Sequence, residues 1–289
     1  MVAMTMRKPI PGIMAAAALA GAAGCGTGAR EVPAPIWGVT VDNVENLPEV
    51  IRSLQGFSRT LTARIVFDSG TSADYYLPAL KEIRKYAFIM GELHDSWDIK
   101  NTSVADHKKR TREYWKVLKD YVDIWEIGNE VNGDWLGPIP DTVAKIKDAA
   151  RYMKSRGAVT ALTVHYTEGC GGDPEYDLFP WIKKNLDAKF RRDIDYVLVS
   201  YYEVNCDGLR PDWKPVFTRL SGEFPGAKLG FGEVGLDKPA SGKPAYLRRY
   251  YATKVDVPNY VGGFFWWFFY QDCVPKEKPL WKVLQKAVH

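Results

Sequence analysis

The chain has 289 residues, of which 46% are hydrophobic and 26% are charged, so it carries enough apolar surface for a large core and is not globally disordered. Its 39 Lys and Arg residues against 35 Asp and Glu residues give a net charge of +4, too small an excess to indicate a nucleic-acid-binding protein. The length fits two domains or one α/β barrel. Aromatic residues make up 13%, and they serve either a core or a platform for flat apolar ligand faces.

The first 25 residues have the layout of a secretory signal. A basic start at 6–8 precedes an apolar run of small residues at 9–23, which is too short to span a bilayer as a mature helix. The small residues before Cys25 resemble a bacterial lipobox, although Ala22 stands where such boxes usually carry Leu. We expect an exported cell-envelope lipoprotein, periplasmic or on the outer surface, held at the membrane only by its lipid. An ordinary cleaved signal is the alternative. Residues 26–35 are expected to form a flexible tether.

From residue 36 to residue 289, short β-rich runs alternate with amphipathic stretches. Strands are predicted at 36–41, 63–68, 86–93, 123–129, 161–166, 195–202, 228–234 and 262–270. Helices are predicted at 47–54, 74–84, 103–119, 177–187, 213–220, 244–255, 277–288 and in a stretch capped by Asp141. Near-continuous apolar strands suit a parallel sheet covered by helices. The alternation therefore predicts a single (β/α)8 barrel. An open doubly wound sheet is the alternative, but no Gly-x-Gly-x-x-Gly follows an early strand.

In such a barrel the chemistry lies at the C-terminal ends of the strands. Predicted strand four ends near Glu130 and predicted strand seven ends near Glu233, on opposite sides of the barrel mouth. Two carboxyl groups facing each other across a cleft are what glycosidic cleavage requires, because one donates a proton while the other attacks or activates water. Mutual repulsion is expected to raise the pKa of the proton donor. A carboxyl separation of about 5–5.5 Å would indicate a retaining mechanism.

The run Trp-Glu-Ile-Gly-Asn-Glu at 125–130 resembles the Asn-Glu signature of the clan A glycoside hydrolases. The resemblance implies that Glu130 is the acid/base and Glu233 the nucleophile. It further implies that Asn129 hydrogen-bonds the 2-hydroxyl group of the sugar. Glu126, four residues before Glu130, is expected to be a buried carboxylate paired with an arginine rather than a catalyst.

Three further positions match the clan in strand order. Arg64 resembles the arginine that supports the nucleophile, although a core ion pair explains it equally well. Tyr202 matches the tyrosine that hydrogen-bonds the nucleophile. Either Trp266 or Trp267 matches the tryptophan that floors the subsite before the cleaved bond. Strand alternation sends these two indoles in opposite directions. We favour Trp266, because Trp-x-x-x-Tyr resembles clan endings.

Within the clan, residues 127–133 and 200–202 are most similar to the endo-β-1,4-galactanase family. Many clan members carry a histidine where Ser200 stands, and the Trp-Trp-Phe-Phe run at 266–269 is not galactanase-like. The resemblance therefore implies a mechanism but no particular sugar. Outside the clan positions, Trp37 and His165 are expected to contribute to the substrate-binding cleft.

Beyond the signal, three cysteines remain, and an oxidising compartment permits one disulfide and one leftover thiol. Cys170 and Cys206 fall in the loops after neighbouring strands, so a disulfide between them is expected to brace the rim of the barrel. A bond between Cys206 and Cys273 is the alternative. No Cys-x-x-Cys or histidine cluster accompanies these cysteines, so no metal is expected.

The sequence as a whole predicts a monomeric, retaining glycoside hydrolase that cleaves β-glycosidic bonds of a poly- or oligosaccharide by double displacement. It needs no metal or organic cofactor and has no nucleic-acid partner. A non-catalytic carbohydrate-binding envelope lipoprotein on the same barrel is one alternative. A transglycosylase that uses the same two glutamates is the other.

Overall fold

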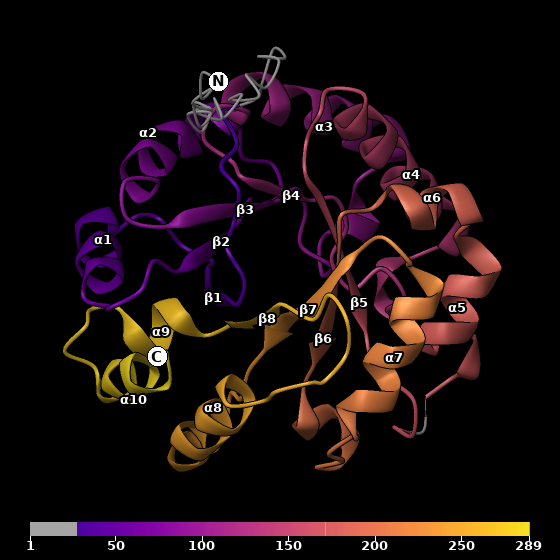
Figure 1. Ribbon diagram of the computed structural model, residues 1–289. Helices are drawn as coiled ribbons and strands as arrows, with labels where there is room; N and C mark the ends of the chain where they lie inside the picture. Colours follow the sequence, from indigo (N-terminus) through magenta and orange to yellow (C-terminus); the bar gives the residue numbers. More distant parts are fainter. Residues whose placement is uncertain (1–27, 171, 289) are drawn as a thin grey trace, which may run out of the picture.

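The computed structural model describes residues 28–170 and 172–288. In these ranges eight parallel strands form one closed barrel in chain order, with helices outside the ring (Figure 1). This confirms the predicted single (β/α)8 barrel. The signal layout and the lipobox at Cys25 lie outside the described residues. No described helix has both the length and the apolarity that a membrane crossing requires.

The strands are β1 (Ile36–Val41), β2 (Thr62–Val66), β3 (Phe88–Glu92), β4 (Ile124–Glu126), β5 (Thr160–His165), β6 (Tyr196–Tyr201), β7 (Lys228–Val234) and β8 (Gly262–Trp266). The helices are α1 (Leu47–Gln55), α2 (Ala73–Ile83), α3 (Val104–Leu118), α4 (Ile139–Lys154), α5 (Leu178–Asn185), α6 (Ala188–Asp193), α7 (Trp213–Glu223), α8 (Lys243–Tyr251), α9 (Phe269–Cys273) and α10 (Pro279–Ala287). All eight predicted strands are present, and β1 and β7 have the predicted bounds.

Three predicted elements differ from the structure. The strand predicted at 262–270 ends at Trp266, and its last two residues belong to α9. Helix α4 begins at Ile139 behind Pro138, so Asp141 lies in its first turn and is not its cap. Proline near the helix start fixes the backbone there without the help of a side-chain cap. The helix predicted at 177–187 ends at Asn185, and the sequence did not predict the helix that follows it. This helix, α6, starts where the side chain of Asp187 accepts a hydrogen bond from the backbone N–H of Phe190.

The barrel has a core on each side of its wall. Residues that open the strands, such as Ile36, Ile124 and Tyr196, pack inside the ring near its N-terminal end. A larger cluster lies between the strands and the surrounding helices, where β2, β5 and β6 are buried along their whole length. Burial on both faces explains why these strands read as almost continuous apolar runs.

Part of the segment that we expected to be a flexible tether is packed against the barrel. Two contacts join the backbone N–H and the guanidinium of Arg30 to the carboxylate of Asp123, at 2.8 and 2.7 Å. Asp123 is buried at the N-terminal end of β4, and Val32 is buried beside it. A buried carboxylate needs a cationic partner. The chain is therefore anchored to the N-terminal end of the barrel at Arg30.

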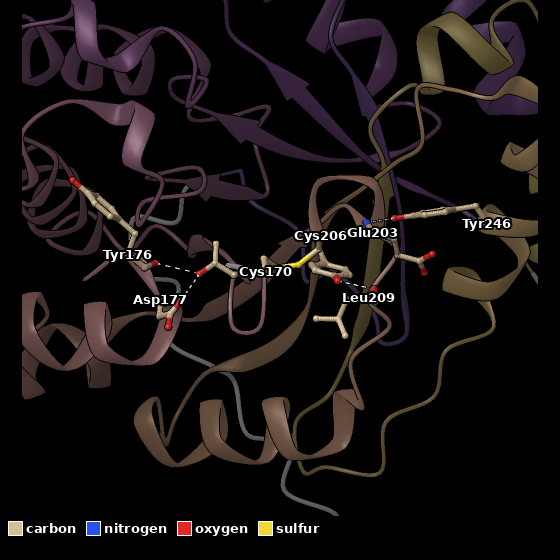
Figure 2. The surroundings of a disulfide bond; sticks show 9 residues. Cys170, Tyr176, Asp177, Glu203, Cys206, Leu209 and Tyr246 are labelled. Carbon is tan, nitrogen blue, oxygen red and sulfur yellow. Dashed lines mark hydrogen bonds between the residues drawn. A yellow bond between two sulfur atoms is a disulfide. The ribbon is translucent and has the colours of Figure 1, made fainter. Parts of the chain in front are cut away.

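Two loops at the opposite end are joined covalently. A disulfide links Cys170, in the loop after β5, to Cys206, in the loop after β6 (Figure 2). Cys273 is a buried free cysteine. The pairing that the sequence favoured is thus present. The second loop is also held by Glu203, whose carboxylate accepts hydrogen bonds from the guanidinium of Arg249.

Candidate active site

A cavity of about 580 Å³ opens at the C-terminal ends of the strands, within the size range of small-ligand sites. Segments that follow six strands, β3 to β8, contribute to its lining. Glu130 and Glu233 both line it, although each is at least nine-tenths buried. The two carboxyl groups that the sequence singled out therefore share one site at the end of the barrel where chemistry is expected.

A bulge in β7 aims Glu233. The β6–β7 register pairs Val199 with Phe231 but Ser200 with Glu233, so β7 carries one extra residue, Gly232. A Cβ atom on Gly232 would lie 2.7 Å from the Cβ of Leu198, too close for any side chain. Only glycine permits this approach. Bulges of this kind turn the following side chain towards a site.

The side-chain oxygens of Glu233 accept hydrogen bonds from the buried Arg64 and the half-buried Tyr202. The Tyr202 hydroxyl donates to Oε1 over 2.6 Å, and the Arg64 guanidinium donates to Oε2 over 2.9 Å. Both contacts fix the orientation of the carboxylate. These are the neighbours that the sequence resemblance implied for the strand-seven glutamate.

Arg64 lies below the cavity and faces three buried carboxylates. Its guanidinium contacts Glu126 at 2.6 Å, Glu233 at 2.9 Å and Glu92 at 3.1 Å. Arg64, Glu92 and Glu126 have no exposed side-chain surface. The Thr163 hydroxyl also donates to Glu126, which is the arginine-paired support carboxylate that we expected. One cation therefore contacts three carboxyl groups.

Three polar side chains surround the carboxylate of Glu130. The Ser200 hydroxyl donates to Oε1 over 2.6 Å, and the Ser96 hydroxyl donates to Oε2 over 2.8 Å. Nδ1 of His165 lies 3.3 Å from Oε1. The backbone of Glu130 has φ +47°, in the left-handed region that non-glycine residues rarely adopt. Such strain persists only where the surroundings hold it, and it is common at functional sites.

The pKa values of the two glutamates are shifted in opposite directions. Burial and the charge of Glu130 raise the pKa of Glu233 to about 8, against the effects of Arg64 and Tyr202. Burial also acts to raise the pKa of Glu130, but His165, Ser200 and Ser96 outweigh it and lower that pKa to about 2. We expected the raised pKa on Glu130. The order is reversed because two serine hydroxyls and the nearby imidazole of His165 stabilise the ionised Glu130. At neutral pH the pair therefore holds one proton, on Glu233.

Two aromatic residues that we placed in the cleft lie elsewhere. Trp266 is fully buried, and its indole N–H donates to Asp272 over 3.0 Å. Trp267 lines the cavity instead. Trp37 lies near the start of β1, at the end of the barrel away from the cavity, and packs against Tyr251 and Phe264.

A bulge in β8 explains the error at Trp266. Between Trp37 and Val39 of β1, the register on β8 advances from Gly263 to Trp266, which is one residue more than regular pairing allows. Phe264 has φ +69°, which breaks the regular strand backbone. The extra residue shifts the alternation of side chains along β8. The orientation predicted for Trp266 assumed regular alternation and was therefore wrong.

Asn129 is buried and is not among the cavity-lining residues. Within the described chain its Oδ1 has no hydrogen-bond partner. His165, in contrast, lines the cavity as expected. The sequence did not identify Ser96 or Ser200 as neighbours of Glu130. Ser200 stood out only as a departure from the clan pattern two residues before Tyr202, and Ser96 gave no signal beyond its place after a strand.

No protein-family model matches the chain, and no curated protein matches it. Solved structures that resemble it include Saccharomyces cerevisiae Gas2p in complex with laminaritriose and laminaritetraose, with 16% identity and a TM-score of 0.55. A Glu-to-Gln mutant of Gas2p in complex with laminaritetraose and laminaripentaose has 16% identity and a TM-score of 0.54. In each case the match covers 88% of this chain but only 63% of the Gas2p chain. At this identity the likeness shows a shared barrel fold.

Proposed function

We propose that the protein is a retaining glycosidase that cleaves β-glycosidic bonds of an oligo- or polysaccharide through Glu130 and Glu233. The observation that carries this proposal is the pair itself. Two buried carboxyl groups line one cavity, and together they hold one proton at neutral pH. A double displacement needs one protonated and one ionised carboxyl group.

In the first step, a carboxylate oxygen of Glu233 bonds to the anomeric carbon. The bond from that carbon to the glycosidic oxygen breaks, and Glu130 gives its proton to the departing oxygen. In the second step, Glu130 takes a proton from water while the water oxygen bonds to the same carbon. The ester bond to Glu233 then breaks, and both carboxyl groups return to their starting state. Arg64 and Tyr202 hold Glu233 in line throughout.

This sequence of steps requires the proton to move from Glu233 to Glu130 when a sugar binds. A bound sugar removes water from Glu130 and places an acceptor, the glycosidic oxygen, against it, and both changes favour the protonated form. Arg64 and Tyr202 still donate to Glu233 and favour its ionised form. The two groups titrate as a pair and share one proton. That proton can therefore lie on Glu233 before a sugar binds and on Glu130 afterwards.

The aromatic lining supports a carbohydrate as the ligand. Trp267 and Trp135 line the cavity, as do Trp97 and Phe268. Aromatic rings offer apolar surfaces on which the faces of sugar rings stack. Because Gas2p structures contain laminari-oligosaccharides, which are β-linked glucose oligomers, we choose these compounds as the first substrates to test.

The experiment compares hydrolysis by the wild type, Glu130→Gln and Glu233→Gln on laminarin and a panel of other β-glycans. We expect each substitution to lower the rate by at least roughly 10²-fold. Glu82→Gln on the outer surface of α2 is the matched control and should leave the rate unchanged. Unchanged hydrolysis in both active-site variants contradicts the proposal. Saccharide binding without any turnover would instead identify a binding protein.

Product analysis separates hydrolysis from glycosyl transfer. If a second sugar hydroxyl replaces water in the second step, the products include oligosaccharides longer than the substrate. The proposed hydrolase yields only shorter products at low substrate concentration. Longer products from purified protein would reassign it as a transglycosylase with the same two glutamates.

A further inference from the structure

The lining of the cavity is rich in carboxyl groups, of which Glu233 is protonated at neutral pH. Four carboxyl side chains line it, those of Asp95, Glu130, Glu233 and Asp237, and none of its described lining residues is Lys or Arg. The chain as a whole has more basic than acidic residues, 39 against 35. The acidic lining is therefore a local property of the site and does not follow from composition.

Three basic side chains lie near the cavity without lining it. Arg64 lies under the cavity and contacts three carboxylates. Lys243 approaches the ring of Phe268 but pairs with Asp272 at 2.7 Å. Nζ of Lys100 lies 5.0 Å from the ring centroid of Trp97 at the edge of the site. None of the three is among the residues that line the cavity.

Two of the four carboxyl groups take no part in the proposed bond cleavage. Asp95 follows β3, and its Oδ1 accepts a hydrogen bond from the backbone N–H of Trp97 over 2.8 Å. Burial raises the pKa of Asp95, so a further negative charge beside it would be costly. Asp237 follows β7 and is exposed. Neither forms a salt bridge within the described chain, where many other carboxylates do.

These features discriminate between classes of sugar. A hydroxyl group on a sugar donates a hydrogen bond to a carboxylate, and a charged acceptor makes that bond strong. A carboxylate, sulfate or phosphate group on the sugar would instead meet like charges in a partly desolvated space. Side chains of Trp267, Trp135 and the 67% exposed Trp97 supply apolar faces that do not depend on ligand charge.

We propose that this cleft accepts glycans whose rings carry only hydroxyl groups and rejects those with carboxylate, sulfate or phosphate groups, and that Asp95 and Asp237 enforce the choice. The inference rests on the proposed glycosidase function, because it assigns the same cavity to a glycan. It adds a substrate class and two specificity-determining residues.

The test uses matched pairs of tetrasaccharides that differ only at C6, which carries either a hydroxyl or a carboxylate group. Laminaritetraose, cellotetraose and β-1,4-galactotetraose are compared with their C6-oxidised forms. Binding to the full-length Glu233→Gln variant is measured by calorimetry, and hydrolysis is measured with the wild type. We expect the hydroxyl form to bind at least about tenfold more tightly in any pair that binds. Added salt should narrow this ratio.

Removing the two outer charges tests their role. With Asp95→Asn and Asp237→Asn added to the Glu233→Gln variant, the ratio should fall by at least about threefold. Asp256→Asn is the matched control, because its side chain is 97% exposed in the loop before β8, at the other end of the barrel. The control should leave the ratio unchanged. A ratio that also persists in the Asp95→Asn, Asp237→Asn variant contradicts the assignment to these residues.

The outcomes separate this inference from the proposed function. Equal binding and equal hydrolysis of both members of a pair overturn the inference and leave the glycosidase proposal standing. Preferential binding of the hydroxyl form without hydrolysis by the wild type supports the inference and overturns the glycosidase proposal. Failure of every tetrasaccharide to bind overturns both.

Discussion

At Arg64, one guanidinium group is surrounded by three carboxyl groups that have almost no access to water. Charge balance in such a place requires a proton on at least one of them. Glu92 is the group that fits, because neither of its oxygens has a hydrogen-bond partner in the described structure. Burial raises the pKa of Glu92 well above its usual range, against the charge of Arg64. Because Glu233 also holds a proton at neutral pH, the positive charge of Arg64 is then balanced by Glu126.

Glutamine substitutions distinguish the neutral carboxyl group from the charged one. Glu92→Gln replaces a neutral group by a neutral isostere, so we expect the free energy of unfolding to change by less than about 1 kcal/mol. Glu126→Gln removes the charge that pairs with Arg64 at 2.6 Å, and we expect a loss of roughly 3 kcal/mol. Denaturant unfolding at pH 7 measures both. Equal losses in the two variants would show that Glu92 is ionised.

Loss of the proton that Glu130 and Glu233 share is expected to limit the proposed activity at alkaline pH. A raised pKa of about 8 on Glu233 means that the pair keeps its proton below this pH and loses it above. Without that proton no acid remains to assist the leaving oxygen. We expect kcat/KM to fall tenfold per pH unit above pH about 8. Circular dichroism over the same range serves as the control for folding. Constant kcat/KM up to pH 9.5 would contradict this account of the pair.

At the scale of elements, two bulges decide which side chains reach the cavity. The bulge in β7 turns Glu233 into the site, and the bulge in β8 buries Trp266 and leaves Trp267 at the cavity. Strand identity and order follow from the alternation of apolar runs with amphipathic stretches, and the sequence predicts them. An extra residue in a strand leaves that pattern almost unchanged while it reverses the side-chain direction. The hydrophobic pattern therefore could not predict which way the side chain of Trp266 points.

The bulge at Gly232 gives a direct test at this scale. In Gly232→Ala the new methyl group meets the side chain of Leu198 and forces the strand to shift. We expect kcat/KM to fall by roughly 10²-fold, because a displacement of about 1 Å at the nucleophile has an effect of this size.

The matched control is Gly222→Ala in α7, where a methyl group would meet nothing within 4 Å. It should keep full activity and change the free energy of unfolding by no more than about 1 kcal/mol. Wild-type activity in Gly232→Ala would show that the bulge does not aim Glu233.

At the scale of the whole molecule, carboxyl groups line the cavity at one end of the barrel, and Arg30 anchors the preceding segment at the other end. The alternation predicts the barrel and places the two glutamates at strand ends, while their arginine and tyrosine neighbours were implied by the resemblance to the clan A glycoside hydrolases. The sequence does not predict the donors around Glu130, since Ser96 and Ser200 come from different strands and meet only in the fold. For the same reason the order of the two pKa values was wrong.

The central claim, that Glu233 bonds to the sugar while Glu130 handles the proton, is tested most directly by trapping the intermediate. The wild type is incubated with activated 2-deoxy-2-fluoro glycosides of the sugars that it cleaves, and its peptides are analysed by mass spectrometry. The account predicts one glycosyl group per chain on the peptide that contains Glu233, with the label lost in Glu233→Gln. A label on Glu130, or turnover with inverted anomeric configuration and no label, would contradict it.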